Sequence, residues 1–508
     1  MSVFAAIDIG SNSVRLKVAR IVRHRLEAVH EDRVVTRLGE SVFRFGTLAP
    51  KAMDTTIDVL RRFHRAVQKY AADRVRVVAT SALRDSTNAG AFVDWVHSAT
   101  GWKVEVVSGL EEGRLIHLGV LTNTRISASD LLLIDLGGGS CELTVSKRGH
   151  IREMASLPLG AVRLTQDFLL HDPPKAVEIL RLRKDVAEEI ERVSKGIIAA
   201  RVSSVVATSG TAAALASAAR VVERGGRSLK GRAVSRAAVA RLAETLARLD
   251  VKARSKLPGI NPRRAEIIIA GAYVFAELME RCRLPSFRYS PLGLRDGLLA
   301  QMLAEHDRAA RSRRQIEAER EDAVLAMCRH YQVDLKAAAG VRELAVWLFR
   351  ALHAVHRLPP EYETWLSTAA MLSDLGSFIN RNGRHRHTHY LISHSEIFGF
   401  SSAERQIIAA IARYLGKSRP GPADGPVSSL SPADQKLIPK AVALLRLARA
   451  MNHGQAGRMR GLAASVHREK VLLRVPAMTN AELALWMLQR ERAYFREVFG
   501  RDLVLDFA

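Results

Sequence analysis

The first 300 positions of the chain combine two hydrophobic patterns. The segment VRVVAT at 75–80 predicts a short strand. Apolar residues at helical spacing predict a helix over 50–70, and a second predicted helix over 88–101 ends at Gly101. Residues 202–208 repeat the style, because a buried strand there enters a glycine turn and an alanine-rich helix. Strands that alternate with helices are typical of an α/β domain.

The pattern changes near residue 305. Strand signals disappear, and helical periodicity takes over in segments such as 341–356 and 404–415. Residues 416–433 are rich in Pro, Gly and Ser and predict a loop or linker. From residue 466 onward the pattern indicates strand, helix and strand, so we expect a small α+β unit after the helices.

One motif in the first part of the chain occurs twice. Each copy is an apolar strand that ends in an aspartate, then a turn, then a second strand; the turns are DIGSNS at 8–13 and DLGGGS at 135–140. A tight hairpin would explain either copy alone, but two copies in register predict an internal duplication whose second half begins near residue 126. The residues that recur 127 positions apart are Asp8, Gly10, Ser13, Leu16 and Val18, which match Asp135, Gly137, Ser140, Leu143 and Val145.

Turns of this composition suit phosphate groups. Glycine adopts positive φ and lets backbone N–H groups approach an anion closely. A carboxylate at the end of a strand can hold a divalent cation through water, so Asp8 and Asp135 are candidates for cation binding. The candidate phosphate-binding residues of the two turns are Gly10, Ser11, Asn12, Ser13, Gly137, Gly138, Gly139 and Ser140.

The two turns resemble the paired phosphate loops of the actin-like ATPase superfold, in which two α/β halves clasp phosphates across a central cleft. Within that superfold, further segments resemble the Ppx/GppA family of exopolyphosphatases and guanosine pentaphosphate phosphatases. These segments are ATSALRD (79–85), VVSGLEEGRLIHLGV (106–120), SLPLGAVRLT (156–165), ATSGTAAAL (207–215), LPGINPRRAEIIIAGA (257–272) and SPLGLRDGLL (290–299).

This resemblance implies an α/β fold of two tandem actin-like ATPase (ribonuclease H-like) domains, followed by an all-α HD-like domain and a small α+β C-terminal unit. It is dense over about residues 3–300, and residues 373–392 resemble, more loosely, the third domain of the family's long members. The expected domain bounds are 1–125, 126–304, 305–425 and 426–508.

The resemblance also implies roles for three charged side chains. It places the general base on Glu112, where an anionic substrate would raise the proton affinity of the carboxylate and so suit it to accept a proton. Glu142 would help Asp8 and Asp135 position the attacking water or a metal ion, Mg²⁺ or Mn²⁺. Arg84 would grip a phosphate with its fork of donors. The resemblance of 207–215 extends the phosphate-binding set to Ser209, Gly210 and Thr211.

Each of these roles has a structural alternative. Glu112 could merely begin a solvated helix and favour its N-terminal dipole. Glu142 could be an exposed strand residue, and Arg84 could form a surface salt bridge to Asp85 or Asp94.

The helical region departs from the pattern of a metal-dependent HD phosphohydrolase. Such an enzyme needs a His-Asp pair and further His and Asp ligands, but here Ser373 precedes Asp374. No histidine lies between 331 and 352, and Arg449 and Asn452 stand where an acidic ligand would be expected. We therefore expect no second catalytic metal site.

The histidines of RHRHTHY (384–390) are candidate zinc ligands, but their alternate spacing with arginines between them is better explained by a basic loop. A similar basic HxH stretch occurs in the family's long members. That resemblance suggests a contact for a polyphosphate chain, with a solvated loop as the alternative. The residues of this candidate contact are Arg384, His385, Arg386 and His387.

The composition favours an anionic partner. The 508 residues include 77 Lys and Arg against 52 Asp and Glu, a formal charge of +25 that is spread over the whole chain. Such a field attracts polyanions and releases their counterions, although an arginine-rich proteome explains the charge equally well. Aromatic residues make up only 6% and no signature of a nucleic-acid-binding fold is visible, so we expect no specific nucleic-acid partner.

The remaining features indicate a cytoplasmic protein. Cys141, Cys282 and Cys328 lie far apart and support neither a disulfide framework nor a zinc knuckle, so a reducing compartment fits best. The N-terminus lacks the basic region of a signal peptide, and no window offers about 18 uncharged apolar residues, so no membrane contact is expected. The length of 508 residues predicts three or four domains.

Together these features predict an exopolyphosphatase, a Mg²⁺-dependent hydrolase that removes terminal orthophosphate from inorganic polyphosphate. The first alternative is hydrolysis of the 5′ γ-phosphate of guanosine pentaphosphate (pppGpp), with pppGpp and ppGpp as partners. The second is a polyphosphate or alarmone sensor without turnover, against which the presence of Glu112 and Glu142 argues. The family's long members also suggest a homodimer.

Overall fold

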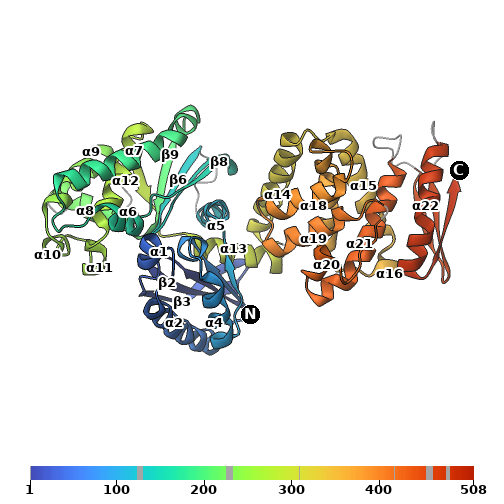
Figure 1. Cartoon of the computed structure of the whole chain (residues 1–508), viewed down its shortest axis with the longest axis horizontal. Helices are drawn as coiled ribbons and strands as arrows, with labels where there is room; N and C mark the ends of the chain where they lie inside the picture. Colours follow the sequence, from blue (N-terminus) through green and yellow to red (C-terminus); the bar gives the residue numbers. More distant parts are fainter. Residues whose placement is uncertain are drawn as a thin grey trace. The chain divides into compact units, whose positions relative to one another are not determined.

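The computed structural model describes residues 2–122, 130–224, 233–307, 309–416, 418–452, 461–475 and 481–507. The chain divides into two compact units, residues 1–316 and residues 317–508 (Figure 1). The sequence predicts four domains, which would subdivide these two units, and this subdivision stays a prediction. Among the helices that the structure describes, none has the length and apolar character needed to cross a bilayer.

The first lobe of residues 1–316 is built on a five-stranded sheet with the order β3-β2-β1-β4-β5. β1 pairs antiparallel with β2 and parallel with β4. Helices α2 and α4 cover one face of the sheet, where Ile7 and Ile9 belong to the same apolar core as Phe63 and Phe92. The elements are β1 (Val3–Ile9), β2 (Ser13–Val22), β3 (Arg25–Val35), α1 (Glu40–Phe45), α2 (Pro50–Lys69), β4 (Arg74–Ala79), α3 (Ser81–Arg84), α4 (Ala89–Thr100) and β5 (Val104–Val106).

The second lobe repeats this plan in a six-stranded sheet with the order β10-β11-β9-β6-β7-β8. β6 pairs antiparallel with β7 and parallel with β9, as β1 does with β2 and β4. The duplication predicted from the two turns is therefore confirmed. The elements are β6 (Leu131–Leu136), β7 (Cys141–Lys147), β8 (His150–Leu157), α6 (Ala161–Phe168), α7 (Ala176–Ala199), β9 (Ser204–Thr208), α8 (Ser209–Arg224), β10 (Val234–Ser235), α9 (Arg236–Arg248), α10 (Val251–Arg254), α11 (Pro262–Ala265), α12 (Ile268–Arg281) and β11 (Ser286–Tyr289).

Helices α5 (Gly109–Thr122) and α13 (Leu294–His306) lie between the two sheets (Figure 1). Ala6 of β1 and Leu133 of β6 share one apolar core with Leu115 of α5 and Leu298 of α13. The inner faces of both sheets thus pack on the same helix pair. Residues at the C-terminal ends of β1 and β6 consequently approach the start of α5.

The two central helices cross at glycines. A Cβ atom on Gly119 would lie 2.6 Å from the backbone nitrogen of Gly297. A Cβ atom on Gly297 would lie 1.8 Å from the carbonyl oxygen of Leu115, closer than a carbon atom can approach. The absence of side chains at both positions therefore permits close backbone packing, which fixes α5 and the acidic residues in its first turn.

Residues 317–508 form a largely helical unit around one apolar core that includes Leu348, Leu366, Ile408 and Leu444. At its C-terminal end β13 pairs antiparallel with β12 and parallel with β14. The predicted strand, helix and strand are confirmed as β13, α22 and β14, whereas β12 is not predicted by the pattern. The elements, of which α14 begins just before this unit, are α14 (Arg311–His330), α15 (Leu335–Ala351), α16 (His353–His356), α17 (Glu361–Leu372), α18 (Arg384–His394), α19 (Ser402–Arg413), α20 (Gly425–Ser428), α21 (Pro432–Met451), β12 (Ala463–Val466), β13 (Lys470–Val475), α22 (Ala481–Phe499) and β14 (Asp502–Phe507).

The prediction of a basic loop for RHRHTHY is wrong, because these residues form the first turns of α18. Gly383, whose φ is +71°, precedes the helix. Thr388 and Ile392 lie one turn apart and are fully buried. With so few apolar side chains facing inward, the segment has no apolar stripe from which a helix could be predicted.

Candidate active site

The two aspartates of the repeated motif lie on the inner faces of the sheets, toward α5 and α13. Side chains alternate along a strand, and Ala6 packs on the inner side, so Asp8 points the same way. The same alternation on β6 places Asp135 on the inner face of its sheet. The register pairs Asp8 with Arg15 and Asp135 with Glu142. At equivalent positions, one lobe thus presents an arginine and the other a glutamate.

Three carboxyl groups from three elements meet in this cleft. Glu112 of α5, Asp135 of β6 and Glu142 of β7 each bring an oxygen within 4.8 Å of the others. Glu112 is 7% exposed and Glu142 is 2% exposed, so Glu112 does not begin a solvated helix and Glu142 is not an exposed strand residue. Among the described residues, the Oε2 atom of each glutamate is buried without a hydrogen-bond partner.

Burial and crowding raise the pKa values of these groups. Burial raises the pKa of Glu112 well above its ordinary value, and the neighbouring Glu142 adds to the shift. Burial, followed by the charge of Asp135, raises the pKa of Glu142 to about 7. Burial also raises the pKa of Asp135, while a hydrogen bond donated by Thr208 opposes this shift. The three groups therefore resist ionising together.

This donor set fits a divalent cation. Carboxylate oxygens are the ligands that Mg²⁺ and Mn²⁺ prefer, and buried oxygens that lack a hydrogen-bond partner among the described residues are free to ligate a cation. Asp8, the other candidate ligand, is not among the three carboxyl groups that come within 4.8 Å of one another. Burial raises its pKa, and Arg15, Arg295 and Arg33 oppose that shift.

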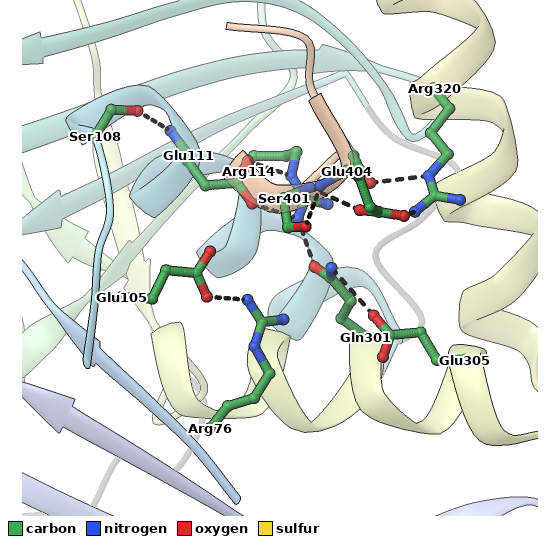
Figure 2. A network of polar contacts seen from close by, with 11 residues as sticks. Arg76, Glu105, Ser108, Glu111, Arg114, Gln301, Glu305, Arg320, Ser401 and Glu404 are labelled. Atoms are coloured by element: carbon green, nitrogen blue, oxygen red, sulfur yellow. Dashed lines mark hydrogen bonds and ion pairs between the residues drawn. The ribbon is translucent and has the colours of Figure 1, made fainter. Parts of the chain in front are cut away.

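Arg114 distinguishes the two adjacent glutamates at the start of α5. Its fully buried guanidinium donates hydrogen bonds to both carboxylate oxygens of Glu111, at 2.8 and 2.7 Å. It also donates to Gln301 of α13 at 2.7 Å (Figure 2). Because Glu111 is held by Arg114, only Glu112 belongs to the carboxylate group of the cleft.

Arg84 lies at the edge of the carboxylate group. Its Nη1 atom donates to the carbonyl of Val107 at 2.8 Å and lies 3.6 Å from Oε2 of Glu112. Asp85 instead forms an ion pair with Arg163. The surface pair between Arg84 and Asp85 is therefore not formed, and the Arg84 guanidinium faces the site.

The two glycine turns are closed by the same hydrogen bond. The Gly10 N–H donates to the Ser13 carbonyl at 3.2 Å, and the Gly137 N–H donates to the Ser140 carbonyl at 2.9 Å. The repeat in the sequence is thus also a repeat in backbone conformation.

The carbonyls of the second turn are directed toward α6. Those of Gly137 and Gly138 accept hydrogen bonds from the first amides of α6 at 3.0 and 2.8 Å. The carbonyl of Gly139 accepts from Nε of Arg163 at 2.9 Å. In a trans peptide the carbonyl and the following N–H point in opposite directions. Three successive N–H groups therefore point away from α6, an arrangement that binds anions.

The first turn faces the second. The carbonyls of Ser11 and Asn12 accept hydrogen bonds from the amides of Gly39 and Arg37, at 2.8 and 3.2 Å. A Cβ atom on Gly138 would lie 3.1 Å from Cβ of Ser11 and 3.3 Å from the backbone nitrogen of Asn12. Glycine at this position lets the two turns approach each other closely.

The third predicted phosphate-binding segment forms the turn between β9 and α8. Ser209 has a φ of +78°, and its buried hydroxyl has no hydrogen-bond partner among the described residues. A non-glycine residue in this conformation costs about 1–3 kcal/mol, and such residues cluster at functional sites. A Cβ atom on Gly210 would lie 2.0 Å from Nη2 of Arg264, and the Thr211 hydroxyl lies 3.5 Å from Nη1 of Arg264. This turn therefore faces a guanidinium group.

Sequence reasoning missed an arginine-lined pocket beside the first turn. Arg33, Arg263 and Arg264 line this pocket of about 390 Å³. Burial lowers the pKa of Arg264 to about 9, and the nearby charges of Arg33 and Arg15 add to the shift. Within the described ranges, Arg15, Arg33 and Arg264 form no ion pair with a carboxylate. The residues lining the pocket are Asn12, Arg33, Val35, Asn261, Pro262, Arg263 and Arg264.

One signal could have revealed Arg15. It follows Asp8 by seven positions, as Glu142 follows Asp135, so the duplication itself places Arg15 opposite a site residue. Arg33 is paired with Arg15 across β2 and β3. Arg264 comes from a distant segment, and no local pattern connects it with the other two.

The basic residues of α18 lie in the other unit. His385 is partly buried with an unpartnered Nδ1 among the described residues, and burial, followed by Arg384 and Arg449, lowers its pKa to about 4. Arg386 is exposed and His387 is partly exposed. Arg449 donates hydrogen bonds to Ser373 and Asp374 at 2.8 and 3.0 Å. The expectation that this region holds no second catalytic metal site stays a prediction.

Two duplicated α/β lobes, facing glycine turns and a buried carboxylate cluster are suited to phosphoryl transfer, as expected from the resemblance to the actin-like ATPase superfold. The chain belongs to the Ppx/GppA phosphatase family: the family's model matches residues 17–306, and the model of its domain III matches residues 320–492. The protein is therefore a hydrolase that acts on phosphoanhydride bonds.

Relatives of known name or structure agree with this placement. The chain is 27% identical over 416 residues to guanosine-5′-triphosphate,3′-diphosphate pyrophosphatase of Aeromonas salmonicida, which covers 80% of this chain and 79% of the relative. A crystal structure of the Aquifex aeolicus family member is 30% identical, with a TM-score of 0.52 over 60% of this chain and 99% of that one. An exopolyphosphatase structure from Cytophaga hutchinsonii, 24% identical, shares the fold with a TM-score of 0.56 over 60% of this chain and 98% of that one.

Proposed function

We propose that the protein is an exopolyphosphatase, which hydrolyses the terminal phosphoanhydride bond of inorganic polyphosphate. The observation that carries this proposal is the pocket beside the first glycine turn. Its seven described lining residues include three arginines and two asparagines but no aromatic ring on which a base could stack. Guanidinium groups without carboxylate partners suit a chain of phosphates better than a nucleoside.

In the proposed reaction, Glu112 accepts a proton from a water molecule as that water attacks the terminal phosphorus. The bond to the bridging oxygen breaks, which releases orthophosphate and a polymer shorter by one unit. Glu142 and Asp135, with Asp8 nearby, would hold Mg²⁺ or Mn²⁺; the cation would neutralise charge on the phosphoryl oxygens. Arg84 and the N–H groups of the glycine turns would orient the terminal phosphate.

A second substrate, pppGpp, is favoured by a different observation. The relative from Aeromonas salmonicida bears the name of a guanosine-5′-triphosphate,3′-diphosphate pyrophosphatase and matches 80% of the chain. The terminal phosphate of pppGpp would meet the same carboxylates and glycine turns. The two candidate substrates differ only in the group that carries the terminal phosphates, which is a longer phosphate chain in polyphosphate and a guanosine nucleotide in pppGpp.

The remaining features of the proposal concern the partner surfaces. The basic start of α18, with Arg384 and His385, would contact a polymer too long for the cleft, and Arg386 and His387 would extend this contact. The formal charge of +25 supports a polyanionic substrate. A cytoplasmic location and a homodimer complete the proposal.

The experiment that tests the proposal measures orthophosphate release with Mg²⁺ from long-chain polyphosphate and from pppGpp in parallel. We expect a higher kcat/KM for the polymer, with loss of terminal units one at a time. A higher kcat/KM for pppGpp would move the function to the second candidate. Binding of both compounds without release of orthophosphate would indicate a sensor and contradict both enzymatic proposals.

A further inference from the structure

Arg163 of α6 connects the two lobes next to the glycine turns. Its Nε atom donates to the carbonyl of Gly139 at 2.9 Å, within the second turn. Its Nη2 atom forms an ion pair with Asp85, which belongs to the first lobe. The guanidinium also stacks over the ring of Phe43, with 4.2 Å between its central carbon and the ring centroid. One planar group thus contacts a backbone carbonyl, a carboxylate and an aromatic face.

The partners of Arg163 are themselves parts of the site. Asp85 directly follows Arg84, the arginine beside Glu112. Gly139 belongs to the turn whose N–H groups point away from α6. Phe43 of the first lobe packs against Ala161, Val162 and Ile267 of the second, so an apolar contact supports the same junction.

We propose that Arg163 is a positioning residue that sets the distance between the second glycine turn and Arg84. Both of these groups have to grip the same terminal phosphoryl group. Arg163 acts through its hydrogen bond to Gly139 and its ion pair with Asp85, and it does not itself bind the substrate. This role rests on the proposed hydrolysis of a terminal phosphoanhydride bond. It is the same whether the substrate is polyphosphate or pppGpp.

The physical reason lies in the shape of the guanidinium group. Its donors form a rigid planar fork, so Nε and Nη2 reach Gly139 and Asp85 in one fixed geometry while the flat face covers Phe43. Replacement of this fork leaves the turn free to move relative to Arg84. A displacement of about 1 Å at a site of phosphoryl transfer lowers the rate about 100-fold.

The test is a double-mutant cycle in the full-length protein with Arg163→Gln, Asp85→Asn and the double variant. It measures kcat, KM and Tm on whichever of polyphosphate and pppGpp the wild type hydrolyses better. We expect Arg163→Gln to lower kcat about 10- to 100-fold with little change in KM. The double variant should be no worse than Arg163→Gln, because both changes break one shared interaction.

A matched control is Glu266→Gln, which breaks another ion pair between the lobes. Glu266 pairs with Arg37 at 2.6 Å and is not one of the three clustered carboxylates. We expect this variant to keep the kcat of the wild type. The Tm of Glu266→Gln and the Tm of Arg163→Gln should both lie within about 4 °C of the wild-type Tm.

Four results would overturn the inference. An unchanged kcat with an unchanged KM would show that Arg163 has no part in the reaction. An unchanged kcat with a raised KM would show that Arg163 binds the substrate directly. Losses that multiply in the double variant would show that Arg163 and Asp85 act independently. An equal loss of kcat in Glu266→Gln would show a general effect of interlobe contacts. The proposed function is tested separately, by comparing the two substrates with the wild-type enzyme. The role of Arg163 is tested by the kcat ratios between variants, which are all measured on one substrate.

Discussion

Glu142 is buried among groups of like charge, and this environment couples its protonation to folding. Its pKa is raised to about 7 from an ordinary value of 4.5 by burial first and then by Asp135. Between pH 4.5 and 7 the folded protein holds this proton and the unfolded chain has lost it. The free energy of unfolding of the metal-free protein therefore falls as the pH rises through this window.

The change that tests this coupling is Glu142→Gln, which keeps the shape of the side chain and removes its charge. Without divalent cations, we expect the variant to be more stable than the wild type at pH 8 by about 1–3 kcal/mol. At pH 4 the difference in the free energy of unfolding should largely vanish, because Glu142 is then mostly protonated in both the folded and the unfolded wild type. Urea unfolding of both proteins at the two pH values measures it.

The addition of Mg²⁺ at pH 8 provides the internal control. The cation should raise the stability of the wild type, since it offsets the repulsion among the carboxylates, and should do so less in the variant. A variant that is less stable than the wild type at pH 8 without metal would contradict this description of the site.

Individual site residues differ in how far the sequence predicts them. Glu112 and Glu142 lie in segments that resemble the Ppx/GppA family, and this resemblance implies their roles; both side chains are buried, and the roles stay predictions. Arg33 and Arg264 could not be found in this way, because no local pattern connects the edge strand β3 with the short helix α11 more than 200 positions away. Their proximity follows only from the packing of the two lobes.

At the scale of elements, α6 determines the conformation of the second glycine turn. A Cβ atom on Gly160, the residue before α6, would lie 2.2 Å from the backbone carbon of Gly139 and 2.3 Å from the carbonyl oxygen of Gly138. These neighbours are backbone atoms, which cannot move aside as a flexible side chain can.

We therefore expect Gly160→Ala to displace the turn, lower kcat about 100-fold and lower the stability by about 1–3 kcal/mol. The matched control is Gly90→Ala in α4, where a Cβ atom would meet nothing within 4 Å. That substitution should leave the activity unchanged, as measured by orthophosphate release and thermal unfolding. A Gly160→Ala enzyme with the rate of the wild type would show that the turn tolerates displacement.

The helices predicted over 50–70 and 88–101 follow from hydrophobic periodicity and are confirmed as α2 and α4, and α18 shows where this reasoning fails. The segment carries histidine and arginine at successive positions, so the pattern contains no apolar stripe. The helix is stabilised instead by tertiary contacts. A Cβ atom on Gly376 would lie 1.9 Å from the carbonyl of Arg384, and the Gly376 N–H donates to the Thr388 hydroxyl at 2.9 Å. Close packing of two segments is not encoded in local periodicity.

At the scale of the molecule, residues 1–316 contain all the catalytic candidates in one compact unit. The Aquifex aeolicus family member matches 60% of this chain over 99% of its own length, so a family member without a counterpart of the remaining part exists. Residues 317–508 therefore add a separate unit, to which the family's domain III model corresponds. The sequence predicts this change of architecture through the loss of strand signals near residue 305.

In the proposed reaction, hydrolysis depends on Glu112 as the general base. The most direct measurement compares the full-length wild type and Glu112→Gln with Mg²⁺, recording both polyphosphate binding and the rate of orthophosphate release. The substitution removes the proton acceptor and keeps the side chain's shape, so we expect unchanged binding and a rate lower by about 10²- to 10⁴-fold. A Glu112→Gln enzyme that releases orthophosphate at the rate of the wild type would contradict the role of Glu112 as the general base.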